Sequence, residues 1–293
     1  MGEDYAGVGA GEEGAGSGCG PRGREAEPKH GGARALFRAL HEGELPLVLP
    51  NAWDVASALA FVEAGFPVLG TTSLGVAAAR GVPDGGRDSL AASVRLARRL
   101  APLGVPLSVD VEDGGFDAPS EVAGLVAALT ETGPHVVGVN IEDSSAGRLV
   151  TPAAHAAKVA AVKERAPGIF LNARVDTYWT GQDATPGATL DRARAYVAAG
   201  ADGIFVPGVA EPSVVRELAG ELPVPLNVLP VAGADLRQLA AWGVRRVSTG
   251  SLPYRAALRA AVDVAEAVRG GWALPAAEPY AALQDRLAVM PRA

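Results

Sequence analysis

The chain has 293 residues, a formal net charge of −7 and a hydrophobic content of 48%, which supports a large buried core and excludes a wholly disordered protein. The acidic balance without basic runs argues against nucleic acid and anionic membranes as partners. One cysteine, Cys19, excludes a disulfide framework and a Cys-based metal site. With no signal peptide and no apolar stretch long enough for a membrane helix, a cytoplasmic location is expected.

Residues 1–31 differ from the rest of the chain. This segment is rich in glycine and charge and has almost no large apolar side chains, so it cannot bury enough surface to offset its ordering entropy. It is predicted to be a disordered tail, in which Cys19 has no folded environment to activate it. Residues 32–293 are predicted to form one domain.

One unit recurs along this domain: a short apolar strand bounded by Pro or Gly, followed by an Ala-, Leu- and Arg-rich helical stretch. The helices are expected to begin at cap residues, among them Asp54, Ser120 and Thr189. A further amphipathic helix is predicted at 278–287. The eight predicted strands cover residues 46–53, 67–73, 106–113, 136–143, 168–176, 203–209, 225–231 and 245–251.

Eight strands that alternate with helices predict an α/β fold of the (β/α)8 TIM barrel type. The alternative is a doubly wound open sheet, which normally carries a Gly-rich phosphate turn after its first strand. The sequence there reads NAWDVAS, without that turn, and this favours the barrel. Barrel enzymes build their chemistry at the carboxyl ends of the strands.

Polar side chains gather where the predicted strands end. Asp110 and Glu112 stand two apart in the third strand, so alternation places them on one face, and Asn140 with Glu142 repeats the pattern in the fourth. Because converging carboxylates repel one another, we expect a cation between Asp110, Glu112 and Glu142, and a hard divalent ion is the simplest choice. Arg174, in the fifth strand, offers a planar fork for a substrate carboxylate.

The ends of the first two strands offer further candidates. Backbone N–H groups of Thr72, Ser73 and Leu74 could face an oxyanion or a carboxylate. Trp53 is either a core aromatic or a wall of the pocket, and Asp54 is expected to cap the first helix. The remaining acidic residues at strand ends are interpreted as solvated or as caps: Asp113, Asp143 and Asp176.

Several segments together resemble the isocitrate lyase/phosphoenolpyruvate mutase superfamily: NAWDVASALAFVEAGFPVLGTTSLGVAAARGVPDGG, SVDVEDGGF, VGVNIEDS, LNARVDTY, AYVAAGADGIFVPG and PLNVL, over about residues 34–260. The resemblance implies a (β/α)8 barrel, commonly with its eighth helix swapped between subunits, and hence a homo-oligomer, a dimer or a tetramer. It also implies Mg²⁺, with Mn²⁺ as the alternative ion, and a small oxyacid substrate that reacts through an enolate-like species.

Matched residue by residue, the acidic pair of the superfamily falls on Asp110 and Glu112 as metal ligands. The glutamate that the superfamily carries in strand four matches Glu142, which is expected to be a metal ligand and a catalytic residue. The arginine that it carries in strand five matches Arg174, which is expected to be catalytic and to bind substrate. The expected substrate-binding set, with Arg174, comprises Trp53, Thr72, Ser73, Leu74, Asp84 and Asn227.

The departures from the superfamily pattern bear on the reaction. Lyases of the superfamily carry a K-[KR]-C-G-H loop after strand four, whereas EDSSAGRLVTPAAHAAKV has no cysteine here, and the gating loop of the mutases is missing as well. Glu112 stands where relatives have aspartate, and Gly208 where the lyases have glutamate. The residues that would deliver a proton to a leaving group are therefore lost.

These features predict a Mg²⁺-dependent lyase that cleaves or decarboxylates a small 2-oxo or 2-hydroxy carboxylate, because departing CO₂ needs no general acid. Water, His155 or Asp84 could return a proton. Two alternatives remain open: P–C chemistry of the phosphoenolpyruvate mutase or phosphonopyruvate hydrolase type, and a non-catalytic oxyacid-binding protein.

Overall fold

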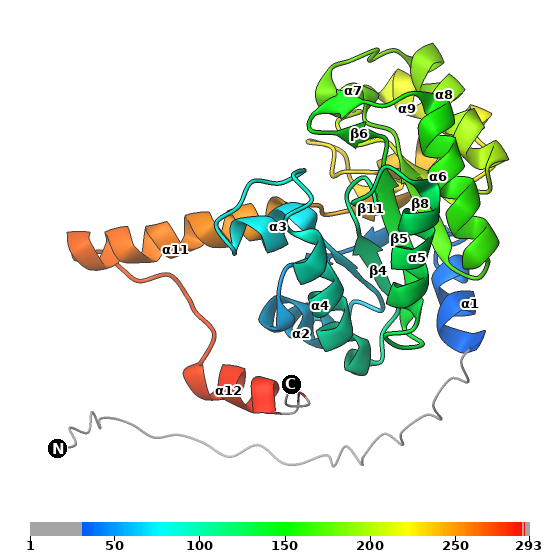
Figure 1. The fold of residues 1–293 in the computed structure, drawn as a ribbon. Coiled ribbons are helices and arrows are strands. Elements are labelled where there is room, and N and C mark those ends of the chain that lie inside the picture. The colour runs from blue at the N-terminus through cyan, green and yellow to red at the C-terminus, as the bar shows by residue number, and fades with distance from the viewer. Residues whose placement is uncertain (1–30, 289, 291–293) are drawn as a thin grey trace, which may run out of the picture.

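The computed structural model describes residues 31–288 and 290, so nearly all of the predicted tail, Cys19 included, lies outside the described residues. The fold is an α/β barrel (Figure 1). Its strands are β1 (Leu47–Leu49), β2 (Asn51–Ala52), β3 (Leu69–Thr71), β4 (Leu107–Asp110), β5 (Val136–Glu142), β8 (Phe170–Arg174), β9 (Gly203–Phe205), β10 (Leu226–Val228) and β11 (Val244–Ser248), with β6 (Ser144–Ser145) and β7 (Arg148–Leu149) forming a separate hairpin.

Most of the helices follow a strand and cover the outside of the barrel. A 3₁₀ turn, η1 (Ala101–Leu103), precedes β4. The helices are α1 (Gly31–Ala39), α2 (Val55–Glu63), α3 (Ser73–Ala78), α4 (Leu90–Leu100), α5 (Pro119–Thr130), α6 (Pro152–Arg165), α7 (Thr177–Thr180), α8 (Pro186–Ala198), α9 (Pro212–Glu221), α10 (Leu236–Ala241), α11 (Leu252–Gly270) and α12 (Tyr280–Ala288).

Pro50 divides the first barrel strand in two. The strand order is β1-β11-β10-β9-β8-β5-β4-β3-β2, and every pair in it is parallel. Proline has no N–H to donate to a neighbouring strand. Before Pro50 in the chain β1 pairs with β11, and after Pro50 β2 pairs with β3. These two half-strands join the ends of the sheet, and the predicted eight-stranded barrel is confirmed.

Of the three N-cap residues predicted from the sequence, the structure confirms one. Asp54 caps α2 in a capping box with Ser57, as predicted. The predicted caps Ser120 and Thr189 are wrong, because each helix begins earlier, with a proline in its first turn, after Ala118 or Thr185. Thr189 instead lies buried inside α8.

Two apolar clusters stabilise the barrel. The larger one fills the space between the strands and the outer helices, whereas the smaller one closes the end of the barrel where the strands begin. In this smaller cluster Phe37 of α1 is fully buried and packs edge-on against Phe170 of β8. The helix α1 thus covers the amino ends of the strands, and the pocket described below lies at their carboxyl ends.

The two C-terminal helices pack little against the barrel. In Figure 1, α11 projects away from the barrel, and Ala267 is the only residue of this helix that is buried. Leu258 and Val262, four residues apart on α11, are 51% and 48% exposed. The predicted extra helix is present as α12, and none of its residues is buried. Among residues 31–288 and 290, no helix is long and apolar enough to cross a membrane.

Candidate active site

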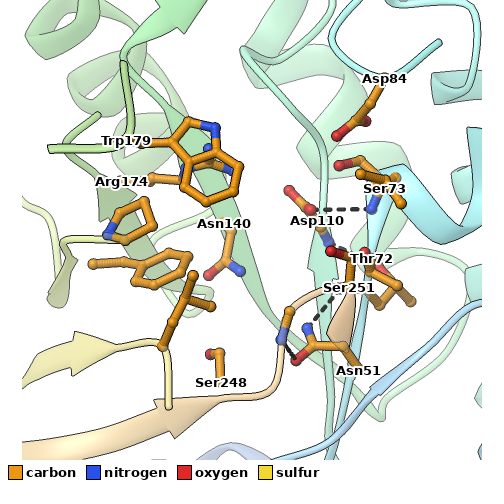
Figure 2. Close-up of a pocket in the computed structure, with 16 residues that line it drawn as sticks. Asn51, Thr72, Ser73, Asp84, Asp110, Asn140, Arg174, Trp179, Ser248 and Ser251 are labelled. Atoms are coloured by element: carbon orange, nitrogen blue, oxygen red, sulfur yellow. Dashed lines mark hydrogen bonds between the residues drawn. The ribbon is translucent and has the colours of Figure 1, made fainter. Parts of the chain in front are cut away.

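A pocket opens at the carboxyl ends of the barrel strands, with an empty volume of about 540 Å³. Figure 2 shows that residues from several strands and from the loops after them face this space. The lining residues are Asn51, Thr71, Thr72, Ser73, Leu74, Asp84, Asp110, Asn140, Arg174, Trp179, Phe205, Pro207, Leu229, Ser248, Gly250 and Ser251.

Asp110 is the last residue of β4, and its carboxylate lies on the pocket wall. Its Oδ2 accepts a hydrogen bond from the backbone N–H of Ser73 at 3.1 Å. Asp84 lies on the same side of the pocket (Figure 2). Partial removal of the Asp84 carboxylate from water raises its pKa, and the negative charge of Asp110 raises it further. A hydrogen bond with Ser73 opposes that rise.

Glu112 does not continue the alternation of the strand. β4 ends at Asp110, and Glu112 adopts a left-handed conformation with φ +53°, so the prediction that both side chains share one strand face is wrong. The Glu112 carboxylate accepts hydrogen bonds from the Ser89 hydroxyl and from the backbone N–H of Arg87 at 3.1 Å. Burial raises its pKa, and the charges of Asp84 and Asp110 raise it further.

Glu142 and Arg174 form an ion pair on the opposite side of the barrel mouth. Arg174 Nη1 lies 2.7 Å from Glu142 Oε2, and Arg174 Nε donates to Asp176 Oδ1 at 2.6 Å. Burial raises the pKa of Glu142 well above its usual value, although the charge of Arg174 opposes this. The guanidinium also lies 5.5 Å from the ring centroid of Trp179 and 5.9 Å from that of Phe205.

Asp176 connects Arg174 to the outer helices. Its Oδ2 accepts from the Ser144 hydroxyl at 2.5 Å, and its backbone N–H donates to Asp143 Oδ1 at 2.8 Å. Asp143 Oδ2 in turn accepts from the Tyr196 hydroxyl at 2.6 Å and from Arg192 at 3.0 Å. The prediction that Asp143 and Asp176 are solvated or cap residues is therefore wrong, because both side chains are buried and hydrogen-bonded within the protein, and Asp176, which precedes α7, makes no side-chain capping bond. Asp113 also pairs with a cation, Arg87, at 2.6 Å.

Four carboxylates influence one another electrostatically around the pocket: Asp84, Asp110, Glu112 and Glu142. In the part of the chain that the structure describes, no three His, Cys, Asp or Glu side chains lie close enough to hold a metal ion between them. The set is all oxygen, which suits a hard divalent cation, and Mg²⁺ takes only one or two carboxylates directly and keeps several waters. The oxygen donors are therefore of the kind that suits Mg²⁺, and Asp110 is the predicted ligand that lines the pocket.

The turn after β3 lies where the sequence placed it. Thr72, Ser73 and Leu74 all line the pocket. The Thr72 hydroxyl accepts from the Gly75 N–H at 3.5 Å as the cap of α3, and the Ser73 N–H donates to Asp110. The Ser73 amide therefore orients the carboxylate of Asp110 in this structure.

Several predicted residues lie away from the pocket lining. Trp53 packs edge-on against Tyr254 at 5.4 Å between ring centroids, and Asn227 is buried and hydrogen-bonded to Ser248. His155, on α6, is fully buried against Tyr196 and has no hydrogen-bond partner among the described residues. Burial lowers its pKa to about 3, so the interpretation of His155 as a proton donor is wrong.

Three polar residues at the ends of the first, fourth and eighth barrel strands were not assigned to the site from the sequence, and all three line the pocket: Asn51, Asn140 and Ser248. Asn51 Nδ2 donates to the Thr71 carbonyl at 2.8 Å, and its Oδ1 accepts from the Gly250 N–H at 2.9 Å. The alternation along β5 had already placed Asn140 on the same strand face as Glu142.

The chain is similar to several known proteins. Residues 37–269 match the family model described as phosphoenolpyruvate phosphomutase. The chain is 51% identical over 251 residues to an uncharacterized protein of Mycobacterium tuberculosis, which covers 86% of this chain and 95% of that protein.

Two named enzymes are less similar to this chain. An oxaloacetate decarboxylase of Ectopseudomonas mendocina is 31% identical over 258 residues, with 82% of this chain and 86% of that one covered. The structure of a phosphonopyruvate hydrolase in complex with oxalate and Mg²⁺ superposes with a TM-score of 0.75 at 23% identity, covering 87% of this chain and 96% of that one. The latter likeness shows a shared fold.

Proposed function

The chain belongs to the isocitrate lyase/phosphoenolpyruvate mutase superfamily, and from that premise we propose that it is a Mg²⁺-dependent lyase for a small 2-oxo or 2-hydroxy carboxylate. The observation that carries the proposal is that Asp110 and Arg174 line one pocket, with further carboxylates around Asp110. A phosphonopyruvate hydrolase of the same fold binds Mg²⁺ and oxalate, and a relative at 31% identity is an oxaloacetate decarboxylase.

In this proposal the residues divide the work between the two sides of the pocket. Bound Mg²⁺ would act as a Lewis acid toward the substrate's oxygen atoms. Asp110 would hold the ion, and Glu112, Glu142 and Asp84 would contribute through water. Arg174, fixed by Glu142 and Asp176, would clamp the substrate carboxylate with its planar fork.

Decarboxylation suits these residues best. When the C–C bond breaks, its electron pair passes into the enolate, and CO₂ leaves without needing a proton. The enolate carbon is then protonated by water or by Asp84, which lines the same pocket. His155 is too far inside the protein to take part.

One set of assays separates the proposed lyase from the two alternatives, P–C chemistry and a non-catalytic binding protein. The full chain should release pyruvate from oxaloacetate or from an alkylated malate when Mg²⁺ is present, and lose this activity with a chelator. Hydrolysis of phosphonopyruvate instead would favour P–C chemistry. Tight oxalate binding without turnover of any oxyacid would favour a binding protein, and no oxalate binding in the presence of Mg²⁺ would reject the site itself.

We also propose that the protein is a cytoplasmic homo-oligomer in which α11 packs on a neighbouring subunit. The support is the exposed apolar face of α11, which includes Leu258 and Val262. Analytical ultracentrifugation should show a dimer or a tetramer, and replacing both residues by glutamate should yield monomers. A wild-type monomer at micromolar concentration would contradict this proposal.

A further inference from the structure

A buried cation lies inside the barrel, next to residues of the pocket. Arg246, on β11, is 0% exposed and is two residues before Ser248, so both side chains face the barrel interior and Arg246 is the deeper one. No carboxylate of the described residues lies within ion-pair distance of it. Burial lowers its pKa to about 9, which still leaves the guanidinium charged at neutral pH.

The guanidinium is held on three sides. Its Nε donates to Ser248 Oγ at 3.1 Å, and its Nη2 donates to Asn140 Oδ1 at 3.3 Å. The ring of Phe37, from the closed end of the barrel, lies with its centroid 6.0 Å away. Nη1 is buried and has no partner among the described residues.

The hydrogen bonds of Arg246 determine how Asn140 faces the pocket. Asn140 Oδ1 accepts from Asn172 Nδ2 at 2.9 Å as well as from Arg246, so both of its lone pairs are occupied. Rotating the Asn140 amide by half a turn would place its NH₂ group against the N–H donors of Asn172 and Arg246. Asn140 therefore has only N–H donors left for a ligand in the pocket that it lines.

Ser248 is restricted in the same way. Its Oγ accepts from Asn227 Nδ2 at 2.9 Å and from Arg246 at 3.1 Å, which leaves only its O–H proton to offer. The Asn227 amide is itself oriented, because its Oδ1 accepts from the Ser248 backbone N–H at 3.2 Å. Asn227, on β10, thus acts on the pocket through Ser248.

We propose that Arg246 is a positioning residue that makes Asn140 and Ser248 a pair of hydrogen-bond donors for an oxygen of the substrate. We call this pair the donor floor. It selects a group that accepts hydrogen bonds, such as a carboxylate or carbonyl oxygen, over an ammonium group, because an ammonium group can only donate and would face two donors backed by a cation. This inference rests on the proposed function, because it takes the ligand to be an oxyacid.

The charge balance supports an anionic ligand. A buried charge is costly unless an opposite charge or dipoles compensate it. Among the residues that the structure describes, Arg246 has two hydrogen-bond partners, Asn140 and Ser248, and the more distant carboxylate of Asp110. An oxyanion at the donor floor would complete this compensation through Asn140 and Ser248. The floor lies in the same pocket as Arg174 and Asp110, as Figure 2 shows.

The test measures oxalate binding to the full chain by calorimetry in Mg²⁺, and Mn²⁺ binding by EPR without oxalate. Ser248→Ala should weaken oxalate binding about tenfold, because a hydrogen bond to a charged group is lost. Asn140→Asp should weaken it further by replacing donors with acceptors, while Arg246 gains a counter-ion that supports folding. Neither variant should weaken Mn²⁺ binding, which a general structural defect would do.

The matched control is Ser108→Ala, since Ser108 is a buried barrel serine that does not line the pocket and has no hydrogen-bond partner among the described residues. It should bind oxalate like the wild type. Arg246→Lys keeps the charge and should retain more oxalate affinity than Arg246→Met; if Arg246→Met does not fold, the Ser248 and Asn140 variants still decide.

The two proposals fail in different ways. If the wild type binds oxalate and both floor variants bind it equally well, the donor floor is wrong and the proposed function stands. If the wild type does not bind oxalate with Mg²⁺, the proposed function is rejected, and the donor floor with it.

Discussion

Replacing Asp110 with asparagine is expected to lower kcat/KM by about 10³-fold, equivalent to roughly 4 kcal/mol of lost transition-state stabilisation. Asp110 is the one member of the predicted ligand set Asp110, Glu112 and Glu142 that lines the pocket. An asparagine keeps the shape of the side chain but removes the charge on which the ion depends.

The asparagine also disturbs the local geometry, because both carboxylate oxygens of Asp110 accept backbone N–H groups. Oδ2 accepts from Ser73 at 3.1 Å, and Oδ1 from Glu112 at 3.4 Å. An amide can accept at only one of its two positions. We therefore expect a weaker Mg²⁺ affinity together with a displaced Ser73 turn.

Steady-state kinetics on oxaloacetate and Mn²⁺ titration by EPR measure the two effects. Asp117→Asn is the matched control, because the Asp117 side chain is 94% exposed and should tolerate the same change. Near-wild-type activity of Asp110→Asn, with unchanged Mn²⁺ affinity, would exclude Asp110 as the residue that holds the metal.

Replacing Arg174 with lysine is expected to raise KM for an oxyacid and to lower kcat/KM about 100-fold. Lysine keeps the positive charge but loses the planar fork that could bind a carboxylate through two parallel hydrogen bonds. Arg174 also bridges Glu142 and Asp176, at 2.7 Å and 2.6 Å, and one ammonium group cannot hold both with the same geometry.

Arg174→Ala is expected to be worse for folding. It leaves Glu142 and Asp176 buried without their cation, and removing one partner of a buried ion pair costs about 3–5 kcal/mol. Urea denaturation without ligand measures this loss. Because the side chain of Arg194 is 52% exposed on α8, Arg194→Ala should be nearly neutral.

The two replacements of Arg174 separate substrate binding from structure. If lysine restores stability but not KM, the fork acts on the substrate. If lysine restores both, Arg174 only holds Glu142 and Asp176 in place, and the substrate carboxylate binds elsewhere in the pocket.

Much of the fold could be predicted from local sequence. Alternating strand and helix segments indicated the barrel, and the clustering of polar residues at strand ends indicated which end carries the site. Asp54 was recognisable as a cap because capping is a contact between near neighbours in the chain. Asp110, Arg174 and the Thr72–Leu74 turn all lie at the pocket because each stands at or just after a strand end.

Other predictions failed because the position of the residue depends on more than its neighbours in the sequence. Glu112 was placed by a period of two that holds only inside a strand, and the chain leaves the strand after Asp110. Trp53 looked like a pocket wall by its position, but it packs against Tyr254, about 200 residues away in the chain. His155 looked available to a substrate until its burial on α6 was known.

By itself, then, the sequence determined the barrel, the end of it that bears the site, and the acidic and basic residues that meet there, because these follow from periodicity and from the order of strands. Only the tertiary structure decided which carboxylate faces the pocket and which hydrogen-bond partners each polar group has already used. Arg246 shows the reason: its partners Asn140 and Ser248 come from different strands, and their free donors are defined only once those strands lie side by side.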